Sequence, residues 1–280
     1  MNNSENSEVL IVGDSCQDKF TYGKSNRQCP DVPAPVFTPI RSVHNMGMAG
    51  NVFNNLQSLG LECDLLTNRS RCIKHRYVDL KSNHTFLRVD TEDNMSRIPE
   101  NWRSGYDLDK YKAIVIADYD KGFLQEDDIK YFCDNHDTVF LDTKKLIGTW
   151  CKNAFIVKIN SPEFEAIKNK IDLDEWKNNL LVTLGSRGCM LNTENGFEYF
   201  PVKMVDVSDL SGAGDSFHAG LVYSFVNSKD LNFSIKFANS LATQAVQERG
   251  VSFDFSKWVK SQPSPKEKDL LKNIKEYPSA

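Results

Sequence analysis

The chain has 280 residues, enough for one large α/β domain, or for one domain with a small appendage. Its composition, with 40% hydrophobic and 26% charged residues, is typical of a soluble globular protein. The formal net charge is −4, and no block of lysine and arginine suggests a nucleic-acid-binding surface. A single pocket can still bind small anions, because net charge does not describe one site.

The sequence also argues against membrane insertion, secretion and a zinc site. No apolar run approaches the length of a membrane span, and the first residues lack a basic stretch followed by an apolar one. The seven cysteines are scattered and form no C-x-x-C pair, which favours a reduced compartment over a disulfide framework. Neither cysteines nor histidines cluster at the spacing of zinc ligands. We therefore expect a cytoplasmic protein with no membrane or nucleic-acid partner.

Short apolar runs bounded by turn residues predict buried strands. They lie at 9–13, 113–118, 138–143, 154–160 and 180–185. Continuous apolar character indicates burial on both faces, as in a parallel sheet. Helical periodicity marks the segments at about 48–59, 125–135, 161–169, 213–227 and 231–248. This alternation predicts an α/β fold with a doubly wound sheet covered by helices on both sides.

Two stretches interrupt the alternation of strand and helix. Residues 19–43 contain prolines among β-type residues, and residues 73–90 alternate polar and apolar side chains around a turn near Ser82 and Asn83. Neither stretch fits a crossover helix. We interpret them as a small β-lid added to a single domain that spans residues 1–280.

The sequence DLSGAGDSFHAG, at 209–220, places Gly212 and Gly214 at the start of a predicted helix. Glycines let the backbone turn freely, and the first N–H groups of a helix converge with the positive end of its dipole to form an anion site. The sequence is neither a Walker loop nor a dinucleotide fingerprint, since Phe217 stands where the latter needs glycine. Asp215 beside these glycines is equally consistent with catalysis and with simple stabilisation of the helix dipole.

Three further segments combine polar side chains with the ends of predicted elements. Asn160 and Glu163 follow a strand three residues apart, so both can reach one hydrated magnesium ion, but they also fit a helix cap. The glycine turn TLGSRG, at 183–188, suits close approach of a nucleotide and equally a hairpin. GMAGN, at 47–51, opens an early helix and either holds a polar ligand against Asn51 or packs that helix on a strand.

The order of these segments resembles that of the ribokinase-like, or phosphofructokinase-B type, sugar kinases. The segments VGDSCQD, GMAGN, INSPEFE, TLGSRG and DLSGAGDSF follow the family order, and the likeness covers nearly the whole chain. Within the family, the chain most resembles the kinase domain of bacterial D-glycero-D-manno-heptose-7-phosphate kinases of the ADP-heptose pathway. That finer likeness rests on GDSCQDKFTYGKSNRQCPDVPAPV, KHRYVDLKSNHTFLRVDTE, IADYDKGFL and NSPEFEAI. The resemblance implies a ribokinase-like α/β/α sandwich with a β-lid.

The resemblance also implies a role for each matching residue. Asp215 matches the catalytic base, and the anion hole matches Gly212, Ala213 and Gly214. The nucleotide-binding and magnesium-associated elements match Asn160, Ser161, Pro162, Glu163, Thr183, Gly185 and Gly188, with Asn160 and Glu163 holding Mg²⁺ through water. The sugar-binding side matches Asp14, Asp18, Gly47 and Asn51. Asp209 lies where the family signature begins, near a site for a monovalent cation such as K⁺.

The implied reaction is an ATP-dependent phosphorylation of the anomeric hydroxyl of a heptose 7-phosphate, with ATP and Mg²⁺ as cofactors. A phosphorylated sugar needs cationic contacts for its phosphate. Arg27 and Arg88 stand at positions shared with the heptose-kinase pattern, and Lys19 and Lys121 are further candidates. Each is also consistent with a solvated surface charge. Because exposed sheets often pair between subunits, we expect a homodimer formed through the lids.

The chain departs from the family pattern at three points. Ser211 replaces the usual threonine before G-A-G-D, and Met48 adds bulk beside the predicted sugar pocket. The chain has no H-x-G-H element of the nucleotidyltransferase domain that accompanies many heptose kinases, so we expect a kinase only. The alternatives are a fructose, ribose or nucleoside kinase, a non-catalytic sugar or nucleotide sensor, and a purely structural α/β protein. Asp215 favours an enzyme, because a sensor has no need of a base.

Overall fold

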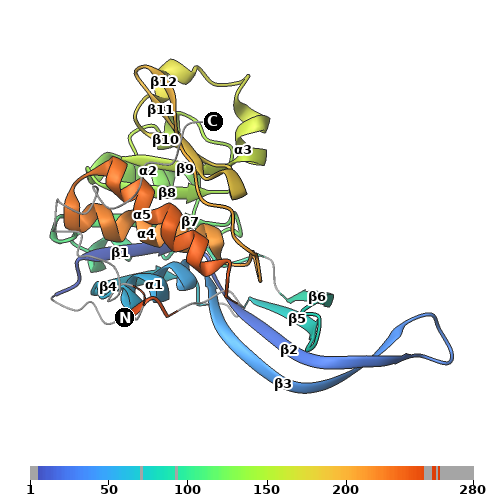
Figure 1. The fold of residues 1–280 in the computed structure, drawn as a ribbon. Helices are drawn as coiled ribbons and strands as arrows, with labels where there is room; N and C mark the ends of the chain where they lie inside the picture. Colours follow the sequence, from blue (N-terminus) through green and yellow to red (C-terminus); the bar gives the residue numbers. More distant parts are fainter. Residues whose placement is uncertain (1–5, 70–71, 92–93, 249–253, 257, 259–280) are drawn as a thin grey trace.

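The body of the protein is an eight-stranded sheet with the strand order β12-β11-β10-β9-β8-β7-β1-β4 (Figure 1). The computed structural model describes residues 6–69, 72–91, 94–248, 254–256 and 258. The strands of the body are β1 (Val9–Gly13), β4 (Cys63–Thr67), β7 (Ala113–Asp118), β8 (Val139–Thr143), β9 (Ile156–Asn160), β10 (Leu180–Thr183), β11 (Cys189–Thr193) and β12 (Gly196–Phe200). All neighbours from β4 to β10 pair in parallel, and β11 and β12 add an antiparallel edge.

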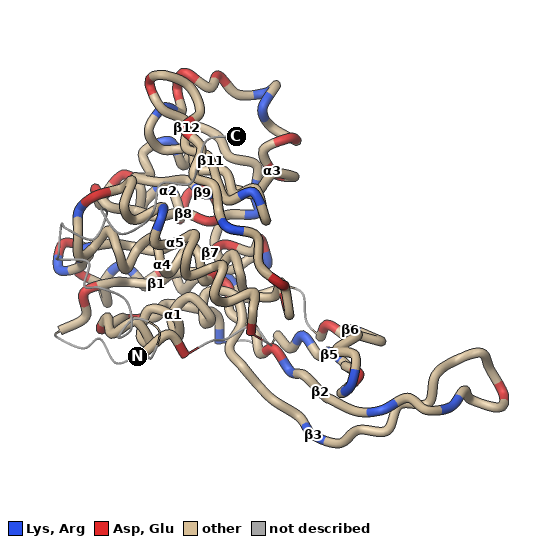
Figure 2. The backbone as a smooth tube through the Cα atoms, viewed as in Figure 1, with Lys and Arg blue, Asp and Glu red and all other residues tan. Residues whose placement is uncertain are grey.

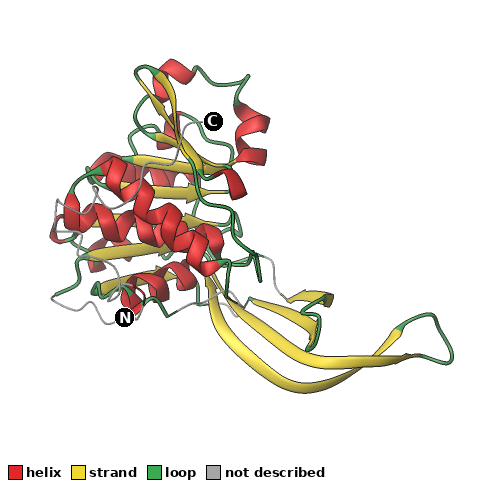
Figure 3. Cartoon of the chain, in the orientation of Figure 1, coloured by secondary structure: helices red, strands yellow, loops and turns green. Residues whose placement is uncertain are grey.

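Helices cover both faces of this sheet (Figure 3). One face packs against α1 (Ala49–Ser58), α4 (Ala213–Ser228) and α5 (Leu231–Ala245), and the other against α2 (Glu126–Asn135) and α3 (Ser161–Ile167). Short 3-10 turns lie at Trp102–Gly105, Leu108–Lys110, Thr149–Cys151, Leu173–Trp176 and Gly185–Arg187. In the described part of the chain, no helix combines the length and apolarity needed to cross a membrane.

Strand β1 explains why the body strands read as continuous apolar runs. Its side chains alternate between the two faces: Leu10 and Val12 pack on the α2 side, whereas Val9 and Ile11 pack on the α1, α4 and α5 side. All four are fully buried. The predicted doubly wound α/β fold is therefore confirmed. The apolar runs did not identify β11 or the two edge strands β4 and β12, all of which include polar or exposed residues.

A second sheet projects from the body (Figure 1) and is called the lid sheet below. It has the order β3-β2-β5-β6 and consists of β2 (Ser15–Gln28), β3 (Pro35–Met48), β5 (Ile73–Asp79) and β6 (Thr85–Thr91). The segments 19–43 and 73–90 supply most of it. Its buried apolar cluster is small and consists of Phe20, Tyr22 and Val78.

Candidate active site

A polar cavity opens at the carboxyl ends of the parallel body strands, the edge at which open α/β sheets bind ligands. It has a volume of about 480 Å³ and lies between the ends of β8, β9 and β10 and the start of α4. Its lining includes Tyr119, Asp142, Lys144, Lys158, Asn160, Ser161, Pro162, Thr183, Gly185 and Gly214. The cavity therefore places two lysines beside the N-terminus of a helix.

Asp215 lies in the first turn of α4 and is buried. The helix begins after Gly212, whose φ of 78° is in the left-handed region that favours glycine. The Asp215 carboxylate accepts a hydrogen bond on Oδ2 from Asn51 Nδ2 at 2.8 Å and one on Oδ1 from the Tyr119 hydroxyl. Burial raises the pKa of Asp215 to about 6, although the hydrogen bonds from Tyr119 and Asn51 lower it. The carboxylate is thus ionised at neutral pH and still basic enough to accept a proton.

A buried ion pair lies beside the first turn of α4. Lys158 Nζ, on β9, is 2.5 Å from Asp142 Oδ2, at the end of β8. A Cβ at Gly214 would lie 3.9 Å from the same lysine nitrogen, so the cation stands next to the helix start. Burial alone would raise the pKa of Asp142, but the charges of Lys158 and Lys144 hold it below its usual value. Asp142 Oδ1 is buried and has no hydrogen-bond partner among the described residues.

Asn160 and Glu163 form a capping box at the start of α3. Asn160 Oδ1 accepts from the Glu163 backbone N–H at 2.9 Å, and Glu163 Oε2 accepts from the Asn160 N–H at 2.8 Å. Lys144 Nζ also donates to Glu163 Oε1 at 2.6 Å. Asn160 lines the polar cavity, whereas Glu163 does not. The structure thus shows the helix-cap arrangement, and a metal role for Glu163 stays a prediction.

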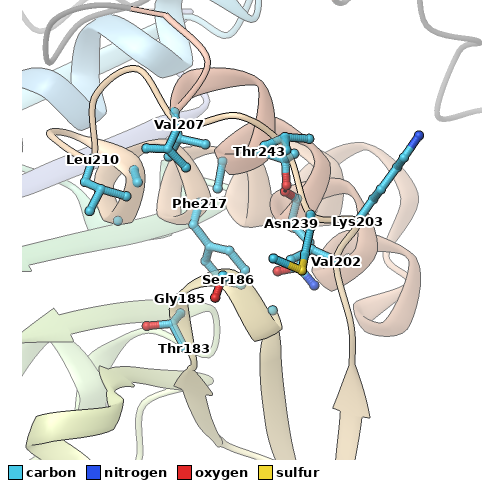
Figure 4. A pocket seen from close by; sticks show the side chains of 17 residues that line it. Thr183, Gly185, Ser186, Val202, Lys203, Val207, Leu210, Phe217, Asn239 and Thr243 are labelled. Carbon is cyan, nitrogen blue, oxygen red and sulfur yellow. The ribbon is translucent and has the colours of Figure 1, made fainter. Parts of the chain in front are cut away.

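A second, mainly apolar cavity of about 320 Å³ adjoins the first (Figure 4). Thr183 and Gly185 line both cavities, and the turn they belong to forms one wall of the second. Phe217, from α4, points toward this turn in Figure 4. The opposite wall comes from the segment around Val202 and from Asn239 and Thr243 of α5.

The two glycines of the 183–188 turn have different reasons to be glycine. Gly188 has a φ of +85°, and a Cβ there would lie 2.0 Å from the Phe200 carbonyl oxygen. Gly185 has a φ of +62°, and a Cβ there would meet nothing within 4 Å. Close packing of β12 therefore excludes a side chain at Gly188, whereas only backbone conformation disfavours one at Gly185.

On the side of the lid sheet, a buried carboxylate meets an arginine. Asp18 of β2 forms an ion pair with Arg76 of β5. A Cβ at Gly47 would lie 2.1 Å from Asp18 Oδ2, so glycine on β3 leaves the room that this carboxylate occupies. Charged residues of both signs occur along the backbone where β2, β5 and β6 leave the body (Figure 2).

Comparison with known proteins identifies the family. Residues 54–258, well over half of the chain, match the family described as pfkB family carbohydrate kinase. The chain belongs to the pfkB family of carbohydrate kinases. This family agrees with the carbohydrate kinase that the sequence motifs predict.

Individual relatives agree with this family. The chain is 28% identical over 299 residues to the bifunctional protein HldE of Campylobacter curvus, covering 87% of this chain and 62% of the relative. It thus spans about three fifths of the length of that relative. Among solved structures, ribokinase from Thermotoga maritima matches with a TM-score of 0.68 at 16% identity, covering 95% of this chain and 99% of that one. Arabidopsis thaliana ribokinase, complexed with ribose and ATP, matches with a TM-score of 0.64 at 13% identity, covering 95% and 98%. These structures confirm the ribokinase-like fold.

The pfkB fold brings most of the predicted residues to one place. The polar cavity is lined by Gly214, Asn160, Ser161, Pro162, Thr183 and Gly185. The apolar cavity is lined by Ala213, Gly214 and Gly188. Asn51 contacts Asp215 directly. Asp209 accepts a hydrogen bond from the Ser211 N–H at 2.8 Å, in the segment that leads to α4.

Three predicted substrate residues have contacts or positions that the motif alone does not reveal. The Asp14 carboxylate is buried and accepts from backbone N–H groups of Tyr119, at 2.7 Å, and Phe123, at 3.2 Å, so it anchors the turn after β7. Arg88 of β6 pairs with Asp90 at 2.5 Å. Arg27 is exposed and lies nine residues beyond Asp18 on β2, roughly 30 Å along an extended strand. Within a single chain, Arg27 is therefore too far along β2 to join Asp18 at the predicted sugar-binding side.

Several site residues escaped the sequence analysis. Lys158 and Asp142 lie within apolar strand runs, where a charge is a signal of a buried pair or a site. Tyr119 belongs to the segment DYDKG, in which only Lys121 was considered. Lys74 of β5 lies 5.5 Å from the centroid of the Tyr119 ring, measured from Nζ.

Proposed function

We propose that this kinase transfers the γ-phosphoryl group of ATP to the anomeric hydroxyl of a sugar that already carries a phosphate, D-glycero-D-manno-heptose 7-phosphate, giving heptose 1,7-bisphosphate. One observation supports this best. The buried Asp215 directly follows Gly214, which lines both cavities, and it accepts a hydrogen bond from Tyr119, whose ring centroid lies 5.5 Å from Lys74 Nζ of the lid sheet.

The apolar cavity suits the base of the nucleotide, and the polar cavity suits its phosphates. Helix α4 opens at Gly212, Ala213 and Gly214, where the positive end of the helix dipole favours developing negative charge. Lys158 and Lys144 add positive charge to the same cavity. These groups would stabilise the transferred phosphoryl group, whose transition state is loose and needs mainly charge and position.

The chemical step needs only one proton acceptor from the protein. The sugar hydroxyl, held between Asp215 and the γ-phosphorus, gives its proton to the carboxylate as its oxygen forms the new bond to phosphorus. The bond between the γ-phosphorus and its bridging oxygen breaks, and ADP leaves with that oxygen. A hydroxyl between carboxylate and phosphate also limits their mutual repulsion.

The register of the lid sheet supports an anionic acceptor. Asp18, Lys74 and Asp90 are register partners across β2, β5 and β6, so their side chains share one face, and Arg76 and Arg88 form the next row outward. Lys74 is half-buried and has no ion pair in the described part of the chain. A sugar whose hydroxyl meets Asp215 would present its far end to these cations. The similarity to HldE supports a heptose as that sugar.

The donor oxygens at the polar cavity fit a hydrated magnesium ion. Asp142 Oδ1 lacks a partner among the described residues, and Asn160 lies nearby on the same cavity. Oxygen ligands and water are what Mg²⁺ prefers, and the ion would neutralise charge on the ATP phosphates. Asp142, Asn160 and Glu163 would hold its water shell. For K⁺, Asp209 is the residue we propose, testable by the K⁺ dependence of an Asp209→Ala variant.

A homodimer through the lid sheets is part of this proposal. The sheet exposes apolar side chains on its edge strands, among them Ile40 on β3 and Leu87 and Val89 on β6. Exposed edges of this kind favour pairing with another chain. Sedimentation at assay concentration would show a dimer, and a monomer would contradict this part of the proposal.

Product analysis tests the function directly. The protein would be incubated with MgATP and a panel of heptose 7-phosphate, fructose 6-phosphate, fructose, ribose and adenosine. The masses of the products would be measured by mass spectrometry. We expect a gain of one phosphoryl group on the heptose 7-phosphate at the highest kcat/KM. Faster turnover of an unphosphorylated acceptor would refute it, and tight nucleotide binding without turnover of any acceptor would favour a sensor.

A further inference from the structure

Tyr119 lies in the turn after β7, and its hydroxyl donates a hydrogen bond to Asp215 Oδ1. Asn51 Nδ2 holds the other carboxylate oxygen at 2.8 Å. We infer that Tyr119 is a positioning residue, which fixes both the orientation and the proton affinity of Asp215. This inference rests on the proposed role of Asp215 as the base.

Two buried aspartates hold the turn that carries Tyr119. Asp14 accepts from the backbone N–H groups of Tyr119 and Phe123, and both Thr143 Oγ1, at 2.6 Å, and Lys145 Nζ, at 2.9 Å, donate to Asp118. The backbone of Tyr119 is thereby tied to β1 through Asp14 and to the end of β8 through Asp118. A donor supported in this way keeps its geometry before the substrate arrives.

The environment of the phenol keeps it a donor. Burial, together with the charge of Asp215, raises the pKa of Tyr119 well above its usual value, so the hydroxyl stays protonated. Lys74 of the lid sheet and Lys144 of the polar cavity lie over the same ring, with Nζ at 5.5 and 5.8 Å from its centroid. Tyr119 therefore contacts a cation from each side of the proposed reaction site, in addition to the base.

Several titratable groups around Asp215 have pKa values away from neutral pH. Burial and nearby carboxylates raise the pKa of Cys16, on β2, to about 12, and burial lowers the pKa of His218, one turn along α4, to about 4. Asp142 stays ionised and Lys144 protonated, because their pKa values move away from neutrality. Lys158 completes the set from β9. Burial also raises the pKa of Asp14, so a change in the acid limb is assigned to Asp215 through the titration of its own carboxyl group.

Removing the phenolic oxygen should raise the proton affinity of Asp215. The hydrogen bond from Tyr119 stabilises the ionised form of Asp215. Its loss in Tyr119→Phe should therefore raise the pKa of Asp215 by about 1 to 2 pH units. The acid limb of kcat/KM should move upward by the same amount, and kcat on its plateau should fall because the carboxylate is less well oriented.

The matched control is Tyr111→Phe. Tyr111 is also buried, and its hydroxyl donates to the buried Asp64 at 2.6 Å, away from the two cavities. That variant loses the same kind of bond, so it should lower the melting temperature similarly and leave both the acid limb and the Asp215 titration in place.

The experiment follows Asp215 by the carboxyl ¹³C shift of protein labelled at the aspartate Cγ, assigned with Asp215→Asn, beside pH–rate profiles. We expect a higher pKa for Asp215 in Y119F and an unchanged pKa for Asp215 in Y111F. An unchanged Asp215 titration in folded Y119F would overturn the inference. If Y119F does not fold, Asp14→Asn, which frees the Tyr119 turn, should shift the titration in the same direction, and no shift would overturn it. The NMR titration needs no substrate, so it remains decisive even if no acceptor is turned over and the proposed function fails.

Discussion

The body sheet and the lid sheet are built from the same kind of strand and differ in what their side chains do. In β1 of the body, every residue is buried, and the apolar cores on the two faces take alternate side chains. In β6 of the lid sheet, every residue is exposed. The lid cluster of Phe20, Tyr22 and Val78 is small beside the two cores of the body.

This contrast separates stability from selection of the substrate. Each fully buried aliphatic or aromatic side chain contributes about 1.5–3 kcal/mol, so the body supplies most of the folding free energy. The lid sheet instead contributes charged side chains, among them Lys74 over the Tyr119 ring, and in the proposed function these select the acceptor. Variants that separate the two regions can therefore test the proposed function.

The largest effect is expected at the point where the regions meet. Asp215→Asn removes the proton acceptor and should lower kcat by about 10²–10⁴-fold. Nucleotide affinity should hold or rise, because one negative charge near the phosphates disappears. Steady-state kinetics and nucleotide titration measure both, and near-normal turnover in a folded variant would contradict the role of Asp215 as a base.

The same variant should alter how stability depends on pH. The folded-state pKa of Asp215, about 6, lies above its unfolded value, so the stability it contributes is present at low pH and is lost as the pH rises through 6. Relative to wild type, Asp215→Asn should therefore be more stable above pH 6, by up to about 3 kcal/mol. This advantage should fade between pH 6 and 4. Urea denaturation at several pH values measures it, and a difference that does not vary with pH would refute the shifted pKa.

A change in the lid sheet should affect the acceptor and leave ATP alone. Lys74→Met removes one charge-assisted contact and should raise KM for the phosphorylated sugar by about 10–100-fold. KM for ATP and the melting temperature should stay close to wild type. The exposed Lys24, farther along β2, offers the control variant Lys24→Met. Equal effects of both variants would mean that Lys74 acts through net charge only.

The smallest effect is expected in the body, at the start of α3. Glu163→Gln should raise the magnesium requirement and lower turnover by about tenfold, because a water ligand loses a charged acceptor. Glu165→Gln, in the same helix, changes an exposed side chain paired with Lys168 and should leave both unchanged. Magnesium titration of activity distinguishes the two. An unchanged requirement in Glu163→Gln would leave Glu163 with its capping role alone.

The amino-acid sequence by itself determined the elements of the body and the start of α4. Burial on both faces makes parallel strands continuously apolar, and Gly212 with Gly214 marks a helix start open to an anion, so local patterns suffice. The family order of the motifs predicts that Asp215 and Asn160 belong to one site. The structure of a segment can be predicted in this way when it depends only on the segment's own periodicity or turn residues.

Only the tertiary structure decided which side chains meet. Tyr119 and Asp215 are 96 positions apart, and Lys158 and Asp142 come from different strands, so no local pattern links them. Arg27 and Arg88 belong to the same lid sheet, yet the length of β2 places Arg27 far from Asp18. The pairing of β5 with β2 places Lys74 opposite Asp18, and Arg76 opposite Phe20. Register and strand length are set by pairing between distant segments, and for that reason the proposed acceptor side of the site is defined only in the folded chain.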